Sequence, residues 1–185
     1  MTKIQDGTGS GNWVRVGDSL KLDVSSRVND RIYYASRDDG KAFTVQFELT
    51  QDTGGATEAL GYLQYTGTGR LNIKQIALTS EEDGLTKFGI WKNPTVSGGD
   101  DATPINLNYG SNNTSNTTAK KAGSVLTITS GSSIYTVRMG VPDTKIVPFY
   151  DAIILGTNDI IAIKANAATT ATALRANIMF AESIT

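Results

Sequence analysis

Carboxylates are the only side chains in this sequence that are grouped as acid–base chemistry would require. Acidic residues stand together at Asp38-Asp39, Glu81-Glu82-Asp83 and Asp100-Asp101. Two carboxyl groups held at a fixed separation can hydrolyse a glycosidic bond, so Glu81 and Asp100 are candidates for such a pair. However, each group stands beside glycine in a predicted turn, where aspartate is favoured for backbone reasons. We therefore expect solvated turn residues and no enzyme.

Several other kinds of chemistry are excluded by composition. The 185 residues include no histidine and no cysteine. Ser-His-Asp and Cys-His catalysis, imidazole or thiolate metal sites and disulfides are therefore impossible. The glycine-rich stretch GTGSG at 7–11 lacks the P-loop pattern, and no acidic stretch matches an EF-hand loop. We expect no cofactor and no bound metal.

Charge and hydropathy restrict the partners. The chain has 17 basic and 18 acidic residues, and no basic stripe stands out along it, so we expect no nucleic-acid partner. No apolar run approaches the roughly 20 residues that cross a bilayer, so we expect no membrane span. The polar N-terminus does not resemble a signal peptide.

Alternation of apolar and polar residues is the strongest structural signal. Phe43, Val45, Phe47 and Leu49 alternate with polar residues, as in a strand with one buried face. Similar runs occur at 20–24, 58–66, 70–79, 87–92, 105–109, 124–129, 133–139 and 145–149. The run at 70–79 changes phase, which indicates a bulge or burial on both faces. Such short strands, with no helical crossovers, predict an all-β antiparallel β-sandwich or β-barrel.

The C-terminal residues 151–182 predict the closing strands of that sandwich. Ile153–Leu155 is a short strand, GTND is a turn, and a strand at 161–167 follows. A helix over 171–182 is the rival for the last segment, since Leu174 and Ile178 lie four residues apart. Threonine content and clean alternation favour a strand. Its inward face, either core or oligomer contact, carries Leu174, Ala176, Ile178 and Phe180.

Three stretches depart from this pattern. Residues 1–12 are rich in glycine and poor in apolar anchors, which predicts an extended N-terminal arm before a single β-sandwich domain at 13–185. Residues 93–123 form a long polar excursion, and Trp91 just before it is a candidate for an exposed contact. At most one or two short helices are expected, the best candidate being 28–38.

Several stretches, taken in order, resemble structural proteins of tailed-bacteriophage virions. They are GSGNWVRVGDSLKLDVSSRV, IYYASRDDGKAF, ALGYLQYTGTGRLNIKQIAL, KNPT leading into INLNYGS, and the closing DAIILGTNDIIAIKANAATTATALRANIMFAE. The closing stretch resembles the last hairpin of a viral-type jelly roll. The resemblance therefore implies that the β-sandwich is jelly-roll-like.

Members of this group are similar to capsid decoration (cement) proteins, which are commonly trimers on the outer face of the head. The resemblance implies a homotrimer on the capsid outer surface of a virion, with the major capsid protein as partner. The arm would then contact the capsid through Ile4, Gln5, Asp6 and Trp13. The alternative is a phage head or tail fibre module, in which Trp91 contacts a receptor or glycan.

Overall fold

The chain divides into two compact units, residues 1–30 and 31–185, in the computed structural model. The structure describes residues 3–5, 13–15, 36, 40–52, 54–82, 84–123 and 125–183. In the first unit, β1 (Lys3–Gln5) pairs antiparallel with β2 (Trp13–Arg15). The rest of the predicted arm and the predicted strand at 20–24 lie outside the described residues. The predicted helix at 28–38 also lies outside the described residues, except for Ser36, whose backbone is helical.

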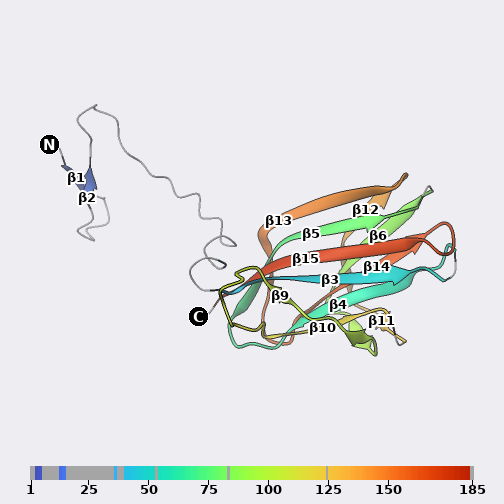
Figure 1. Ribbon diagram of the computed structural model, residues 1–185, viewed down its shortest axis with the longest axis horizontal. Helices are drawn as coiled ribbons and strands as arrows, with labels where there is room; N and C mark the ends of the chain where they lie inside the picture. The colour runs from blue at the N-terminus through green and yellow to red at the C-terminus, as the bar shows by residue number, and fades with distance from the viewer. Residues whose placement is uncertain are drawn as a thin grey trace. The chain divides into compact units, whose positions relative to one another are not determined.

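The second unit is a β-sandwich of two antiparallel sheets (Figure 1). The six-stranded sheet has the order β12-β6-β14-β4-β10-β8, and the five-stranded sheet has the order β13-β5-β15-β3-β9. The eight long strands are β3 (Ala42–Thr50), β4 (Glu58–Tyr65), β5 (Arg70–Ser80), β6 (Thr86–Lys92), β12 (Ser132–Met139), β13 (Asp143–Leu155), β14 (Ile160–Ala167) and β15 (Ala173–Ser183). The short strands are β7 (Thr95–Ser97), β8 (Asp100–Asp101), β9 (Ile105–Asn106), β10 (Thr117–Lys121) and β11 (Thr127–Thr129).

The pairing of the eight long strands is that of a jelly roll. The first pairs with the last, β3 with β15, and moving inward along the chain β4 pairs with β14, β5 with β13 and β6 with β12. These nested pairs fall alternately into the two sheets. Such an arrangement is one long antiparallel ribbon wound into two facing sheets. The predicted all-β, jelly-roll-like sandwich is therefore confirmed.

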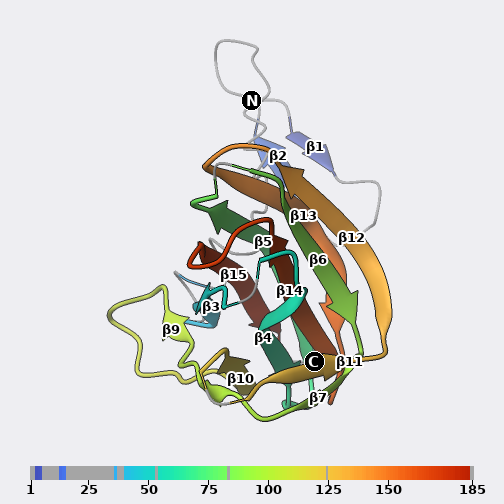
Figure 2. The same cartoon turned by 90° about the vertical axis from the view of Figure 1, so that its right-hand side faces the viewer.

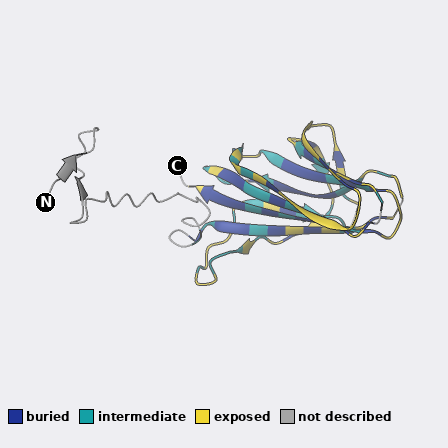
Figure 3. Ribbon diagram, turned by 90° about the horizontal axis from the view of Figure 1, so that it is seen from above, coloured by how far each residue is buried: buried dark blue, intermediate teal, exposed yellow. Residues whose placement is uncertain are grey.

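Alternation along the strands builds the core between the sheets, and Figure 3 shows buried bands alternating with exposed ones. Leu174, Ala176, Ile178 and Phe180 of β15 are fully buried, and the ring of Phe43 stacks on that of Phe180 with centroids 5.8 Å apart. The segment 173–183 is thus a strand, and the rival helix is wrong.

A second, smaller cluster lies on the outer face of the six-stranded sheet. There β7 and β11 pair as a two-stranded sheet. Ile128 of β11 packs against Tyr62 and Ala162, with Val96 and Leu126 beside them. The predicted polar excursion at 93–123 therefore holds four short strands, β7 to β10, and the first helps to cover this face.

Three sequence-based expectations are changed in detail. The strands predicted at 145–149 and 153–155 are one long strand, β13, interrupted by a bulge. The strand predicted at 105–109 is limited to Ile105–Asn106, and Tyr109 is 97% exposed. The phase change in β5 is a bulge, because the register against β15 shifts between Met179 and Phe180. No helix of the described residues is long and apolar enough to cross a membrane.

Candidate functional site

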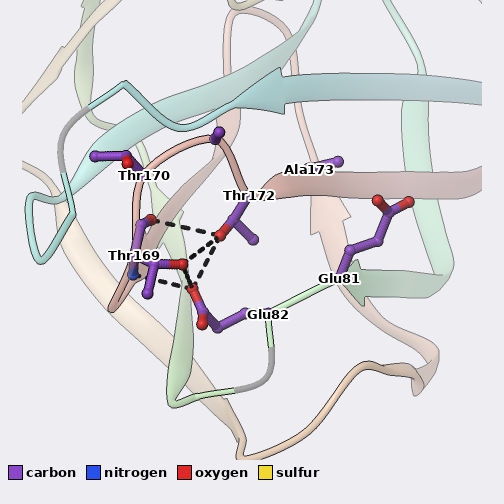
Figure 4. A pocket seen from close by; sticks show the side chains of 7 residues that line it. Glu81, Glu82, Thr169, Thr170, Thr172 and Ala173 are labelled. Atoms are coloured by element: carbon purple, nitrogen blue, oxygen red, sulfur yellow. Dashed lines mark hydrogen bonds between the residues drawn. The ribbon is translucent and has the colours of Figure 1, made fainter.

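The acidic group at 81–83 contains one buried carboxylate, that of Glu82, and its hydrogen bonds are structural (Figure 4). Glu82 is 5% exposed. Its Oε2 accepts hydrogen bonds from Thr169 Oγ1 at 2.6 Å, from the Thr169 backbone N–H at 3.0 Å and from Thr172 Oγ1 at 2.9 Å. Its Oε1 accepts one from the Gly84 N–H at 3.0 Å. Glu82 thus ties the β5–β6 loop to the β14–β15 turn, so the expectation of a solvated turn residue is wrong for it.

These hydrogen bonds favour the ionised carboxylate. The Thr169 hydroxyl, and after it the Thr169 backbone N–H, are the largest causes that lower the pKa of Glu82 to about 2. A proton on Glu82 would compete with the three donors on Oε2 or the one donor on Oε1. The low pKa makes this group unsuited to act as a general acid near neutral pH.

Glu82 is expected to make folding sensitive to acid. The pKa of Glu82 is lower in the folded chain than in the unfolded one. Its contribution to the free energy of unfolding is therefore fully present above about pH 4.5 and is lost as the pH falls towards about 2. In urea titrations between pH 6 and pH 2, Glu82→Gln should therefore show a shallower loss of stability than the wild type. Glu81→Gln, which removes an exposed carboxylate next to it, is the control. Equal pH slopes for the wild type and Glu82→Gln would contradict this role.

The described acidic candidates Glu81, Asp100 and Asp101 do not come together as a catalytic pair, and Asp38, Asp39 and Asp83 lie outside the described residues. Glu81 Oε1 lies 2.5 Å from Arg175 Nη1, and Arg175 Nε lies 2.9 Å from Glu48 Oε1. Asp100 and Asp101 form β8 in the other sheet, which is a strand where a turn was expected. Within the described ranges, no cluster of three or more acidic side chains could hold a metal ion.

The site residues predicted from the sequence are spread over several environments. Leu174, Ile178 and Phe180 are fully buried between the sheets. Trp91 is half-buried in β6, with the Lys164 ammonium 4.7 Å from its ring centroid. Of the predicted capsid-contact residues, Ile4, Gln5 and Trp13 lie in the paired strands β1 and β2. Asp6 lies outside the described residues.

Exposed apolar side chains gather along β12, β13 and the turn between them. Among the described residues ten large apolar side chains are exposed, and six of them lie on these two strands or the turn between them. We call these six the apolar edge: Ile134, Tyr135, Val141, Ile146, Tyr150 and Ile154, which are 39% to 76% exposed. Large exposed apolar patches usually mark an interaction surface, and these side chains on two adjoining edge strands are candidates for one.

The apolar edge spans both sheets. β12 is the edge strand of the six-stranded sheet and β13 is that of the five-stranded sheet. The two lie at the same side of the sandwich (Figures 1 and 2), where the rings of Tyr135 and Phe149 pack edge to face with centroids 6.0 Å apart. Edge strands in natural proteins are normally covered or charged, because they invite association. This side is neither paired nor covered among the described residues.

A bulge in β13 displays Tyr150. Pro148 is opposite Gln75 and Ile153 is opposite Ile73, so four residues of β13 stand against Lys74 alone. Tyr150 and Asp151 have φ of 47° and 64°, a left-handed backbone conformation that residues other than glycine seldom adopt. Tyr150 is 76% exposed as a result. Pro148 also lacks an N–H, which disfavours the addition of a further strand and leaves side chains to make the contact.

Comparison with known proteins supports neither a family nor a function for the chain. No protein-family model and no curated protein sequence matches the chain. It has a weak similarity to the T13 particle of infectious bursal disease virus, at 12% identity and a TM-score of 0.22, over 78% of this chain and 39% of that one. The VP2 subviral particle of the same virus is similar at 16% identity and a TM-score of 0.19, over 78% and 42%. The chain thus spans about two fifths of these proteins. TM-scores this low define no shared function, so the jelly roll is assigned from the strand order.

Proposed function

We propose that this jelly-roll protein is a structural component of a virion. In particular, it is a capsid decoration (cement) protein of a tailed bacteriophage, which binds the outer surface of the head as a trimer. The observation that carries the proposal is the apolar edge, an exposed apolar surface on a domain in which Glu48, Glu81 and Glu82 are engaged in ion pairs or hydrogen bonds. The sequence resemblance to tailed-phage virion proteins supports the same conclusion.

The apolar edge suits contact between copies of the chain. Its two strands belong to different sheets, so the β12 side of one copy can meet the β13 side of the next. Contacts of this head-to-tail kind close into a ring when the rotation between copies is a whole fraction of a turn. Tyr135 and Tyr150 would be the aromatic anchors, because buried aromatic residues carry much of the energy of protein interfaces.

Decoration would stabilise the shell without chemistry. A protein that binds the assembled shell and not free capsomers lowers the free energy of the assembled state by mass action. Bridging of neighbouring capsomers by one oligomer multiplies this effect through its several linked sites. The N-terminal segment, with Ile4, Gln5, Asp6 and Trp13, is proposed to contact the major capsid protein.

Deletion of residues 2–12 is expected to abolish binding to heads while leaving a folded oligomer. The test uses undecorated heads of the phage whose genome encodes the chain, mixed with full-length or truncated protein and imaged by electron microscopy. Circular dichroism and light scattering establish that the truncated protein is folded and associated. Normal occupancy by the truncated protein would refute the arm contact. If the full-length protein is instead found on a tail fibre, the decoration proposal is wrong and the fibre alternative holds.

A further inference from the structure

The fold brings together basic side chains that are far apart in the sequence. Arg138 of β12 is directly opposite Lys87 of β6, and Lys87 is opposite Asn166 of β14. Lys164 lies two residues from Asn166 on the same strand, so it is diagonal to Lys87. The intervening Phe88 is fully buried in the core, so these cations face outward. We call Lys87, Arg138 and Lys164 the basic patch.

The basic patch is electrostatically unfavourable for the isolated protein. Like charges directly opposite each other on neighbouring strands destabilise the pairing. No described carboxylate forms an ion pair with Lys87, Arg138 or Lys164, whereas Lys120 and Arg175 elsewhere are paired. Lys145 adds to the imbalance, because its Nζ donates to the Arg138 carbonyl oxygen at 3.1 Å. Four cations therefore gather on a chain whose net charge is −1.

An aromatic ring lies beside these cations. Trp91 is two residues beyond Gly89 on the outward face of β6, and the Lys164 ammonium lies 4.7 Å from its ring centroid. Gly89 lies between Lys87 and Trp91, and a Cβ there would come within 2.8 Å of Trp91 Nε1. The indole thus lies low across the sheet over the glycine. The face combines cations with a flat aromatic surface.

We propose that the basic patch and Trp91 bind an acidic polysaccharide, a chain of sugar rings with carboxylate or sulfate groups. Neighbouring strands are about 5 Å apart, a distance comparable to the length of one sugar ring, so cations on adjacent strands can pair with successive acidic groups. Trp91 would pack against a sugar ring, since an indole offers apolar area with a polar N–H. This ligand is independent of the proposed virion role.

Nucleic acid fits the patch less well. Proteins that depend on phosphate neutralisation make roughly 6–10 phosphate contacts, while this patch offers three cations with Lys145 beside them. A short stretch of acidic polysaccharide needs only the local cations.

The test measures binding of the full-length protein to alginate, a polyuronate, and to heparin, a sulfated polysaccharide, by calorimetry at several salt concentrations. The triple variant Lys87→Gln, Arg138→Gln, Lys164→Gln should weaken binding at least tenfold. It should also flatten the dependence on salt, because fewer ions are released. Trp91→Ala should weaken binding with the salt dependence unchanged.

A matched control removes the same charge elsewhere. The variant Lys41→Gln, Arg70→Gln, Lys121→Gln changes three cations outside the patch and should alter affinity less than twofold. Equal losses in the two triple variants, or no binding to either polysaccharide, would overturn the proposal. Tighter binding to single-stranded DNA or to polyglutamate, lost in the patch variant, would overturn it in favour of that ligand.

Discussion

Phe47→Ala is expected to lower the free energy of unfolding by about 3–5 kcal/mol, because a fully buried aromatic ring is lost and the two sheets cannot collapse around the space. Phe47 lies on β3, and its ring occupies the room above Gly61 of the facing β4. Urea denaturation followed by tryptophan fluorescence and by circular dichroism measures the loss. A change below about 1 kcal/mol would show that the core is not packed as described.

Gly61→Ala tests the same contact from the other side. A methyl group at Gly61 would collide with the Phe47 ring, so the variant should lose about 1–3 kcal/mol. Combining it with Phe47→Leu should cost less than the sum of the two single changes, because the smaller side chain makes room. Gly140→Ala is the control, since nothing lies within 4 Å of a Cβ there.

Loss of the apolar edge should dissociate the oligomer. Tyr150→Ala with Ile146→Thr removes two exposed anchors, and hot-spot truncations cost about 2 kcal/mol or more each, roughly 30-fold in affinity. Sedimentation or light scattering over a range of concentrations should show a folded monomer. The folded state itself should be little affected, because both side chains are exposed.

Tyr109→Ala with Ile105→Thr provides the matched control for that experiment. These side chains are 97% and 59% exposed but lie away from β12 and β13. The control should associate like the wild type. A wild-type protein that stays monomeric at all concentrations, or a control that dissociates equally, would rule out the apolar edge as the contact between copies.

Most of the long strands and the fold class could be predicted from the sequence, and the phase change in β5 left a bulge as one of two explanations. Alternation of side chains is a local property, and the buried face of β15 followed from parity alone. The break in the β5 pattern at residue 74 likewise reflects a local change of phase. Strand order is not local, and it was expected from a resemblance to known proteins before the pairing of β3 with β15 established it.

Most of the site could not be predicted, because its partners are remote in the sequence. Glu82 meets Thr169 across 87 residues, and nothing near Glu82 indicates that its carboxylate is buried. Glu182 is similar, since it accepts bonds from Ser115 Oγ at 2.6 Å and from the Asn116 N–H at 2.8 Å. The basic patch cannot be recognised in any short stretch of the sequence, because only the sheet register places Arg138 opposite Lys87.

The position of β15 also determines when this protein can fold during synthesis. β15 is the last of the described strands in chain order, yet it lies inside the five-stranded sheet between β5 and β3. Until residues 173–183 leave the ribosome, β3 lacks its main partner and the β13-β5 pair stays separate from it. Sheets closed by such distant segments fold slowly. A nascent chain therefore cannot complete the sandwich until β15 has left the ribosome.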